Sequence, residues 1–342
     1  MGATLLHRRV QAPPFPLLLN APHTELTGGG PLQLKSGQVT ANSEMAVCIA
    51  ASLVELGKYD PTDIAQRYLV WKPDALGISP QTDGALAALQ MPFLESKAKD
   101  LWLQTGKQIA GNQSLARVGP IGIFYARSVR DRIEASLIDS ALTHFDPRCQ
   151  LACVALSAAV AAALNHPGPV ALPALKVVAA VHTELTSAAA LLGQRHREFV
   201  WEIQEAVKVL KDDLALAQQE DPLLYGPELH LHYQEDFIRV AFRLAFWELF
   251  HAGGLQAGLL DVVNRGGHSS ANGAIAGALL GAVYGDQEIP TSWSASLFEV
   301  PFHLQRGPHW ELYHPRLLLA LSDKVISNRE SEQKLKPRKP SR

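Results

Sequence analysis

The sequence has little cysteine, and this excludes a disulfide framework. Cys48, Cys149 and Cys153 are the only three in 342 residues, and each lies in an apolar run. An odd number of thiols in such surroundings favours buried free cysteines in a reducing compartment. Cys149 and Cys153 fall on one helix face, but no second pair or histidine cluster completes a zinc site with them. His230 and His232 form a second weak pair, for which alternation in a loop is the commoner explanation.

Charge of one sign and long apolar runs are also missing. The formal net charge is −2 and the isoelectric point is near 6.7, so no basic surface indicates nucleic acid or an anionic membrane. The longest apolar runs, 151–164 and 274–284, are shorter than a membrane span. Prolines at positions 13, 14 and 16 interrupt any signal peptide. We expect a cytoplasmic protein that binds neither nucleic acid nor membrane.

Strand patterns are scarce, whereas helical patterns recur along the chain. Met45, Ile49, Leu53 and Leu56 share one helix face, and Gly57 is placed to end that helix. The clearest periodic element covers 197–217, with apolar residues on one face and charges on the other. The pattern predicts one all-α domain over 25–325. Residues 1–24 read as an irregular segment, and 326–342 as a disordered polar tail.

Residues 264–285 are the most informative stretch. They open with a glycine pair and small polar side chains, and then become an apolar helix. Gly273, Gly277 and Gly281 recur every fourth position, which leaves a bare stripe where a neighbouring backbone can approach. The polar start predicts a buried helix N-terminus, whose free backbone donors and positive dipole end favour an anion or a ligand.

The same stretch resembles the ADP-ribosylglycohydrolases, in which an asparagine is followed by any residue and then by Gly-Gly-Asp-Thr-Asp-Thr. The glycine-rich lead-in at 26–40, the segments 110–122 and 143–147, and Ile289-Pro-Thr-Ser-Trp293 also resemble that family. The resemblance implies a single compact multi-helix ADP-ribosylglycohydrolase-like domain. It also implies an ADP-ribose-like small molecule or an ADP-ribosylated protein as partner.

The acidic residues of the family are replaced in two separate segments. Where relatives have Thr-Asp-Asp-Thr, this chain has Thr40-Ala-Asn-Ser43, and where they have Asp-Thr-Asp-Thr it has His268-Ser-Ser-Ala271. In relatives these acids hold two magnesium ions. Two divalent ions need several anionic oxygens, because neutral ligands do not offset their lost hydration. The sequence therefore predicts no metal site and no magnesium cofactor, and loss of the magnesium-dependent hydrolysis.

The remaining cleft positions predict where a ligand contacts the chain. Asn112 matches a cleft asparagine of the family, Gln113 replaces a glycine there, and His144 matches a histidine near the ribose, although a structural loop histidine is equally consistent. Thr40, Asn42 and Ser43 are also suited to cap the following helix. The full candidate set is Thr40, Asn42, Ser43, Asn112, Gln113, His144, Gly266, Gly267, His268, Ser269 and Ser270.

His268 leaves two interpretations open. It is either an imidazolium that substitutes for a metal, or a space-filling side chain that hydrogen-bonds to Ser43 or Asn42, and we favour the second. Gln113 and His268 also motivate an alternative function, a divergent metal-independent hydrolase or glycosidase with a repurposed pocket. A stray acid would then serve as general base. The nearest in sequence are Glu44, Asp83, Asp146 and Asp261.

Overall fold

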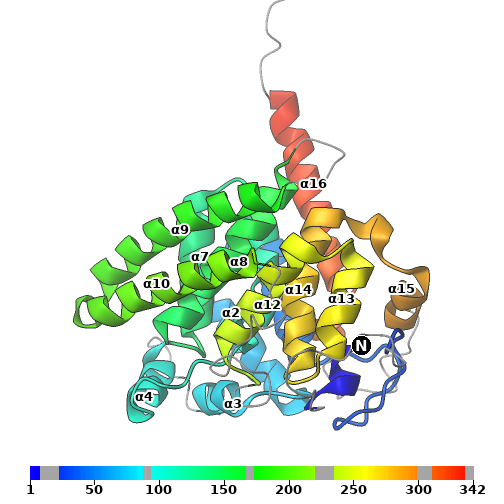
Figure 1. The fold of residues 1–342 in the computed structure, drawn as a ribbon, viewed down its shortest axis with the longest axis horizontal. Helices are drawn as coiled ribbons and strands as arrows, with labels where there is room; N and C mark the ends of the chain where they lie inside the picture. Colours follow the sequence, from blue (N-terminus) through cyan, green and yellow to red (C-terminus); the bar gives the residue numbers. More distant parts are fainter. Residues whose placement is uncertain are drawn as a thin grey trace, which may run out of the picture.

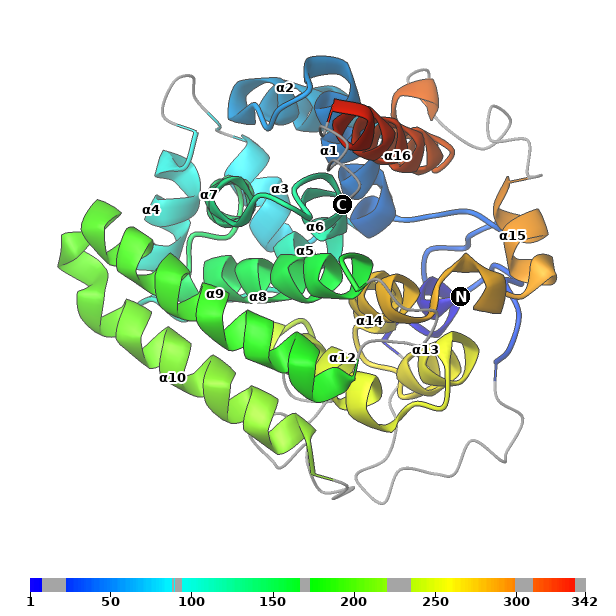
Figure 2. The same cartoon turned by 90° about the horizontal axis from the view of Figure 1, so that it is seen from above.

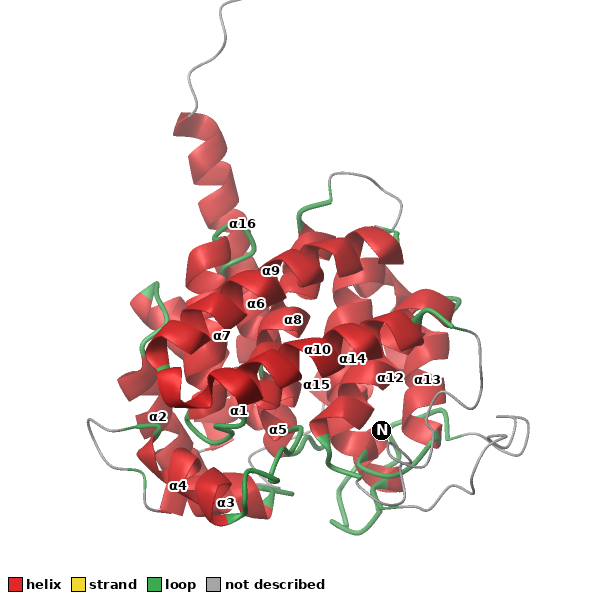
Figure 3. Ribbon diagram, turned by 60° about the vertical axis from the view of Figure 1, so that its left-hand side comes forward, coloured by secondary structure: helices red, strands yellow, loops and turns green. Residues whose placement is uncertain are grey.

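The computed structural model describes residues 1–7, 23–87, 89, 94–166, 173–219, 235–298 and 310–335. Across these ranges the regular structure is helical, and only two isolated β-bridges occur, between Gly29 and Leu34 and between Gly111 and Phe237 (Figure 3). The prediction of an all-α fold is confirmed.

The α-helices follow one another along the whole chain. They are α1 (Ala41–Leu56), α2 (Pro61–Trp71), α3 (Pro80–Ala87), α4 (Ser96–Gln104), α5 (Gln113–Arg117), α6 (Gly119–Phe124), α7 (Val129–Ala141), α8 (Pro147–Leu164), α9 (Ala174–Arg195), α10 (Val200–Ala217), α12 (Ile238–His251), α13 (Leu255–Asn264), α14 (Ser269–Tyr284), α15 (Thr291–Phe298) and α16 (Leu317–Leu335). Short 3₁₀ turns are η1 (Gly2–Leu5), η2 (Lys72–Asp74), η3 (Arg197–Phe199), η4 (Asp286–Glu288) and η6 (Trp310–Tyr313).

Helix α8 forms the centre of the molecule. It packs against α5, α6, α7, α9, α10, α12 and α14, and it carries no charge after Arg148. Its small alanine and serine side chains allow neighbouring helices to approach closely. At Gly122 of α6, an added Cβ would lie 2.8 Å from the carbonyl oxygen of Ser157 in α8. The long helices α9 and α10 lie side by side along one flank of the body (Figure 2).

Helix ends follow the local sequence. Gly57 ends α1 with φ 67°, a left-handed conformation that glycine adopts without strain, and its N–H donates to the carbonyl oxygen of Leu53. Asp60 caps α2 by accepting from the amides of Thr62 and Asp63. Met45, Ile49 and Leu53 are fully buried as predicted.

Three details of the sequence prediction are wrong. Leu56 is 44% exposed rather than buried, because it is the last residue of α1 and the end of the helix leaves the core. The polar tail is not disordered from 326, because α16 continues to Leu335 and projects from the body (Figure 1). The N-terminal segment is not irregular throughout, because residues 2–5 form η1, in which Ala3 and Leu5 are buried.

Two described helices, α8 and α9, are long and apolar enough to cross a membrane by length and composition alone. The apolar window of α8 is 78% buried within the protein and that of α9 is 44% buried. Such burial is typical of a core helix, so this finding gives only weak support for a membrane span. All three cysteines are buried and free, as expected.

We predict that Gly122→Ala destabilises the protein by about 1 to 3 kcal/mol, because the new methyl group would overlap backbone atoms of α8 that have little room to move. Urea unfolding measures the effect. Gly193→Ala is the matched control, since an added Cβ there meets nothing within 4 Å, and it should be neutral or stabilising. Equal stability of the two variants would contradict the close packing of α6 on α8.

Candidate functional site

Three helices that begin far apart in sequence start at the same place. Thr40, Asn112 and His268 are the residues that precede α1, α5 and α14. The three helices pack against one another, so their N-termini converge. Helix starts carry a partial positive charge and backbone N–H groups without a partner inside the helix, and at α1 one of these, the amide of Ala41, donates to the carbonyl oxygen of Leu76 at 2.7 Å. The structure thus brings most of the predicted site residues together.

Direct side-chain hydrogen bonds join the starts of α1 and α14. The hydroxyl of Ser270 lies 3.0 Å from that of Thr40 and accepts a hydrogen bond of 3.3 Å from Nδ2 of Asn42. Thr40 stands at the N-cap position, but its side chain makes no capping bond to α1, so the capping prediction is wrong at this residue. The hydroxyl is instead used across the seam between the two helices.

A second pair of hydrogen bonds joins α5 to α14. Nδ1 of His268 lies 2.8 Å from Oδ1 of Asn112, and Nδ2 of Asn112 donates to Oδ1 of Asn272 at 3.4 Å. His268 is therefore held by Asn112, and not by Ser43 or Asn42 as the sequence interpretation proposed. It does act as a buried, hydrogen-bonded side chain in the sense of that interpretation.

His268 carries a lowered pKa. Burial lowers it below the ordinary value, the negative charges of Asp236 and Glu235 oppose the shift, and the positive charge of His7 adds to it. A lowered pKa favours neutral imidazole at pH 7, which argues against the imidazolium interpretation.

Residues 2–7, which we call the N-terminal strap, lie over the start of α14. The hydroxyl of Ser269 donates to the carbonyl oxygen of Gly2 at 2.7 Å, and the amide of His7 donates to the carbonyl oxygen of Gly267 at 2.9 Å. Gly266 and Gly267 have φ of 77° and 61°, and this left-handed pair shapes the turn that receives the strap.

The strap also brings acids to the site that sequence reasoning missed. The ring of His7 stacks on that of His268 with centroids 6.3 Å apart, and its Nδ1 pairs with Oε2 of Glu235 at 2.6 Å. Glu235 and Asp236 stand just before α12, where the amide of Ile238 donates to the carbonyl oxygen of Ala110. Two acids before an apolar helical pattern indicate a helix start in the sequence. Their position near α14 follows only from the fold.

Both polar atoms of the Gln113 side chain bond to the backbone of a neighbouring loop. Its Oε1 accepts from the amide of Ser79 at 3.1 Å, and its Nε2 donates to the carbonyl oxygen of Gly77 at 3.0 Å. The side chain is buried and ties the 77–79 loop to α5. Its φ is not positive, so the backbone at this position does not need glycine.

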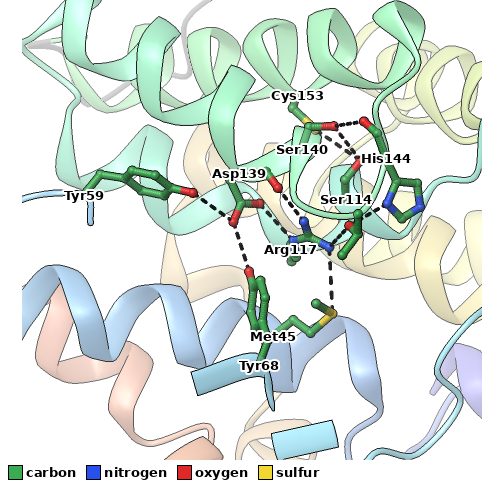
Figure 4. A network of polar contacts seen from close by, with 10 residues as sticks. Met45, Tyr59, Tyr68, Ser114, Arg117, Asp139, Ser140, His144 and Cys153 are labelled. Carbon is green, nitrogen blue, oxygen red and sulfur yellow. Dashed lines mark hydrogen bonds and ion pairs between the residues drawn. The ribbon is translucent and has the colours of Figure 1, made fainter. Parts of the chain in front are cut away.

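His144 belongs to a buried network rather than to an open cleft (Figure 4). Its Nδ1 lies 2.8 Å from the hydroxyl of Thr143, which accepts from Arg117 at 2.9 Å. Arg117 pairs with Asp139 at 2.9 Å, and both side chains are fully buried. The hydroxyl of Tyr68 donates to the same carboxylate at 3.0 Å.

This network fixes the position of α5, and with it the position of Asn112. Helix α5 has only five residues, too few to be stable alone. Arg117 at its C-terminal end is fixed to α7 through Asp139, so the start of α5, and with it Asn112, is held in place. His144 thus has a structural role here, which agrees with the blander of its two interpretations.

The four stray acids are all engaged in contacts. Oε2 of Glu44 accepts from Nε1 of Trp71 at 2.7 Å, and Glu44 is fully buried rather than capping a helix or facing solvent. Asp83 pairs with Lys72. The other two, Asp146 and Asp261, pair with Arg148 and Arg265.

A cavity of about 550 Å³ adjoins the seam. Of the predicted site residues, only Thr40, Ser43 and Ser270 line it. The rest of its wall is mostly apolar and comes from the strap, α13, α14, α15 and α16. His268, Asn112, Gln113 and His144 do not contribute to it.

The donor set at the seam does not fit divalent metal ions. The four positions that match the family's acids hold Ala41, Asn42, His268 and Ser270, and none of these side chains is a carboxylate. Over the described ranges, no group of three or more His, Cys, Asp or Glu side chains could hold a metal ion. His230 and His232 lie outside the described residues.

The fold and the candidate site define an all-α protein in which the starts of three helices meet. The family model for ADP-ribosylglycohydrolase matches residues 5–332. The chain therefore belongs to the ADP-ribosylglycohydrolase family.

The individual relatives have low sequence identity to this chain, but the similarity extends over most of its length. The chain is 25% identical to an ADP-ribosyl-[dinitrogen reductase] glycohydrolase of Rhodospirillum rubrum over 80% of this chain and 79% of that protein. It is 23% identical to the ADP-ribosylarginine hydrolase Tri1 of Pseudomonas putida (strain GB-1), over 79% of this chain and 65% of that protein. A solved ADP-ribosylglycohydrolase-related protein complex shares the fold with a TM-score of 0.58 and 23% identity, covering 95% of this chain and 92% of that one.

Stability should fall at mildly acidic pH because of His144. Burial, and secondarily the positive charge of Arg117, holds its pKa well below the ordinary 6.5. The unfolded chain therefore binds a proton below about pH 6.5 that the folded protein resists, and stability is lost by up to about 1.4 kcal/mol per pH unit as pH falls. Urea unfolding between pH 7.5 and 5.5 (roughly the window set by this pKa) should show a smaller slope for His144→Gln. Equal slopes would contradict the buried neutral histidine.

The strap contact is tested by Gly2→Ala. An added Cβ would overlap the carbonyl of Ser269, so the strap should lift and the amide of His7 should exchange its hydrogen faster. Hydrogen exchange read by mass spectrometry on the first peptide measures this. Gly253→Ala is the control, because an added Cβ there meets nothing within 4 Å. Unchanged protection in Gly2→Ala would show that the strap does not rest on α14.

Proposed function

We propose that this protein retains the family's site for an ADP-ribose-like nucleotide or an ADP-ribosylated protein, but has lost the binuclear magnesium site and magnesium-dependent hydrolysis. The observation that carries the proposal is the seam in which Ser270 hydrogen-bonds directly to Thr40 and Asn42. Side chains that bond to each other across this seam replace the acids that the family uses for metal.

The charge balance supports binding without metal. Magnesium ions in a partly dry site need anionic oxygens, and hydroxyl, amide and neutral imidazole groups do not compensate for lost hydration. The converging helix starts provide backbone donors and partial positive charge, which favour anionic groups such as phosphates. We infer that Gly266, Gly267, His268 and Asn112 contact the nucleotide, with Ser269 released from Gly2 when the strap moves.

The compartment and the partners form part of the same proposal. Three buried free cysteines are consistent with a reducing, cytoplasmic environment. The net charge of −2 argues against nucleic acid as a partner. An ADP-ribosylated protein would present its modified side chain at the start of α14.

Titration of ADP-ribose by calorimetry tests the proposal. We expect saturable binding that is equal with magnesium and with chelator, and weaker binding by His268→Ala, because the imidazole lies at the start of α14. His182→Ala on α9 is the control and should bind normally. Magnesium-dependent release of ADP-ribose from ADP-ribosylarginine peptide, abolished by chelator, would overturn the proposal.

A second candidate is a metal-independent hydrolase, and one observation favours it. Asp236 is exposed, and its negative charge opposes the lowering of the His268 pKa by burial, so we infer that it is the acid that would activate a water molecule. Hydrolysis in chelator that is lost in Asp236→Asn would support this candidate. Gln113 was the other residue that suggested this candidate, but its side-chain amide is hydrogen-bonded to the backbone of the 77–79 loop.

A further inference from the structure

The cavity of about 550 Å³ that adjoins the seam has the properties of a binding site, and the nucleotide proposal does not use its apolar walls. Its volume lies within the range of small-molecule pockets, which are mostly apolar with a few polar groups that orient the ligand. Val263 and Ala274 contribute apolar wall from α13 and α14, and Trp293, Leu297 and Phe298 contribute it from α15.

The polar groups of the cavity lie on the wall formed by the starts of α1 and α14. Thr40, Ser43 and Ser270 supply hydroxyl groups there, and hydroxyls both donate and accept hydrogen bonds. Nε1 of Trp293 donates to the carbonyl oxygen of Thr24 at 2.9 Å. This bond satisfies the polar atom of the indole and fixes its orientation, so the ring contributes apolar surface.

We propose that this cavity binds an uncharged, largely apolar small molecule that carries one hydrogen-bonding group, with the apolar body against α15 and the polar group at the hydroxyls. Apolar contact with the walls would provide most of the affinity. The aromatic residues Trp293 and Phe298 favour a ligand with an aromatic ring, which can pack against them in offset or edge-to-face contact.

Charge separates this ligand from a nucleotide. Asp286 is the one acidic or basic side chain in the cavity wall, and Met1 also lines it, with an amino group whose pKa burial lowers. An anion in the cavity would lose hydration and meet the like charge of Asp286. The apolar wall at α13 and α15 therefore disfavours a diphosphate, whereas the backbone donors at the start of α14 favour one. Thr40 and Ser270 belong both to the seam and to the cavity wall. His268 and Asn112 do not line the cavity, so its apolar part is separate from the proposed nucleotide contacts.

Titration of 1-naphthol into the full chain by calorimetry tests the inference. We expect saturable binding to one site, and at least a tenfold loss of affinity in Ala274→Phe, because the larger side chain fills the cavity from α14. Ala282→Phe, two turns further along the same helix and outside the cavity wall, is the control and should bind as the native protein does. Leu297→Asp is a second variant, in which a charge replaces apolar wall, and thermal unfolding checks that each variant is folded.

Three results would overturn the inference. The first is no saturable binding of 1-naphthol to the native protein. The second is an affinity for 1-naphthol in Ala274→Phe and Leu297→Asp that equals that of the native protein. The third is competitive displacement of 1-naphthol by ADP-ribose. Binding of 1-naphthol by a protein that does not bind ADP-ribose would support the cavity site and refute only the nucleotide proposal. Binding of ADP-ribose without binding of 1-naphthol would support the nucleotide proposal and refute the cavity site.

Discussion

The hydroxyl of Ser270 is the contact on which the account of this site depends. It bonds to Thr40 and Asn42, so the starts of α14 and α1 are held together by neutral groups. Carboxylates in such positions would repel one another unless a cation lay between them. Neutral partners need no cation, and the two helix starts can meet directly. The acids near these helix starts are Glu44 in the first turn of α1, and Glu235 and Asp236, whose charges act on His268. The positive dipole ends also suit the anionic ligand that we propose.

The surrounding fold makes this arrangement rigid. Arg117 fixes the short α5 to α7 through the buried carboxylate of Asp139, and α5 in turn presents Asn112 to His268. A buried ion pair is costly to break, because one uncompensated charge remains. The strap is held on the start of α14 by the hydrogen bond from the Ser269 hydroxyl to the carbonyl oxygen of Gly2, and by the backbone hydrogen bond from His7 to Gly267. The Arg117–Asp139 pair and the strap thus hold the polar residues of the seam in place within the helical body.

The sequence predicted what depends on local pattern. Helix faces, the glycine that ends α1 and the aspartate that caps α2 follow from spacing and backbone preference, and the substituted acids could be read directly. Hydrogen bonds between residues that are distant in sequence could not be predicted. Gln113 was expected at a ligand, but its amide meets the 77–79 loop, and His268 bonds to Asn112, which lies 156 positions away. Glu235 and the strap reach α14 only through tertiary folding.

Magnesium titration by calorimetry tests the central claim most directly. The native protein should give no saturable heat, because the seam offers no anionic oxygen at the positions of the family's acids. A variant with Ala41→Asp, Asn42→Asp, His268→Asp and Ser270→Asp should gain saturable binding that the native protein lacks. Saturable binding of magnesium by the native protein, lost when Asn42 and Ser270 are replaced by alanine, would contradict the account.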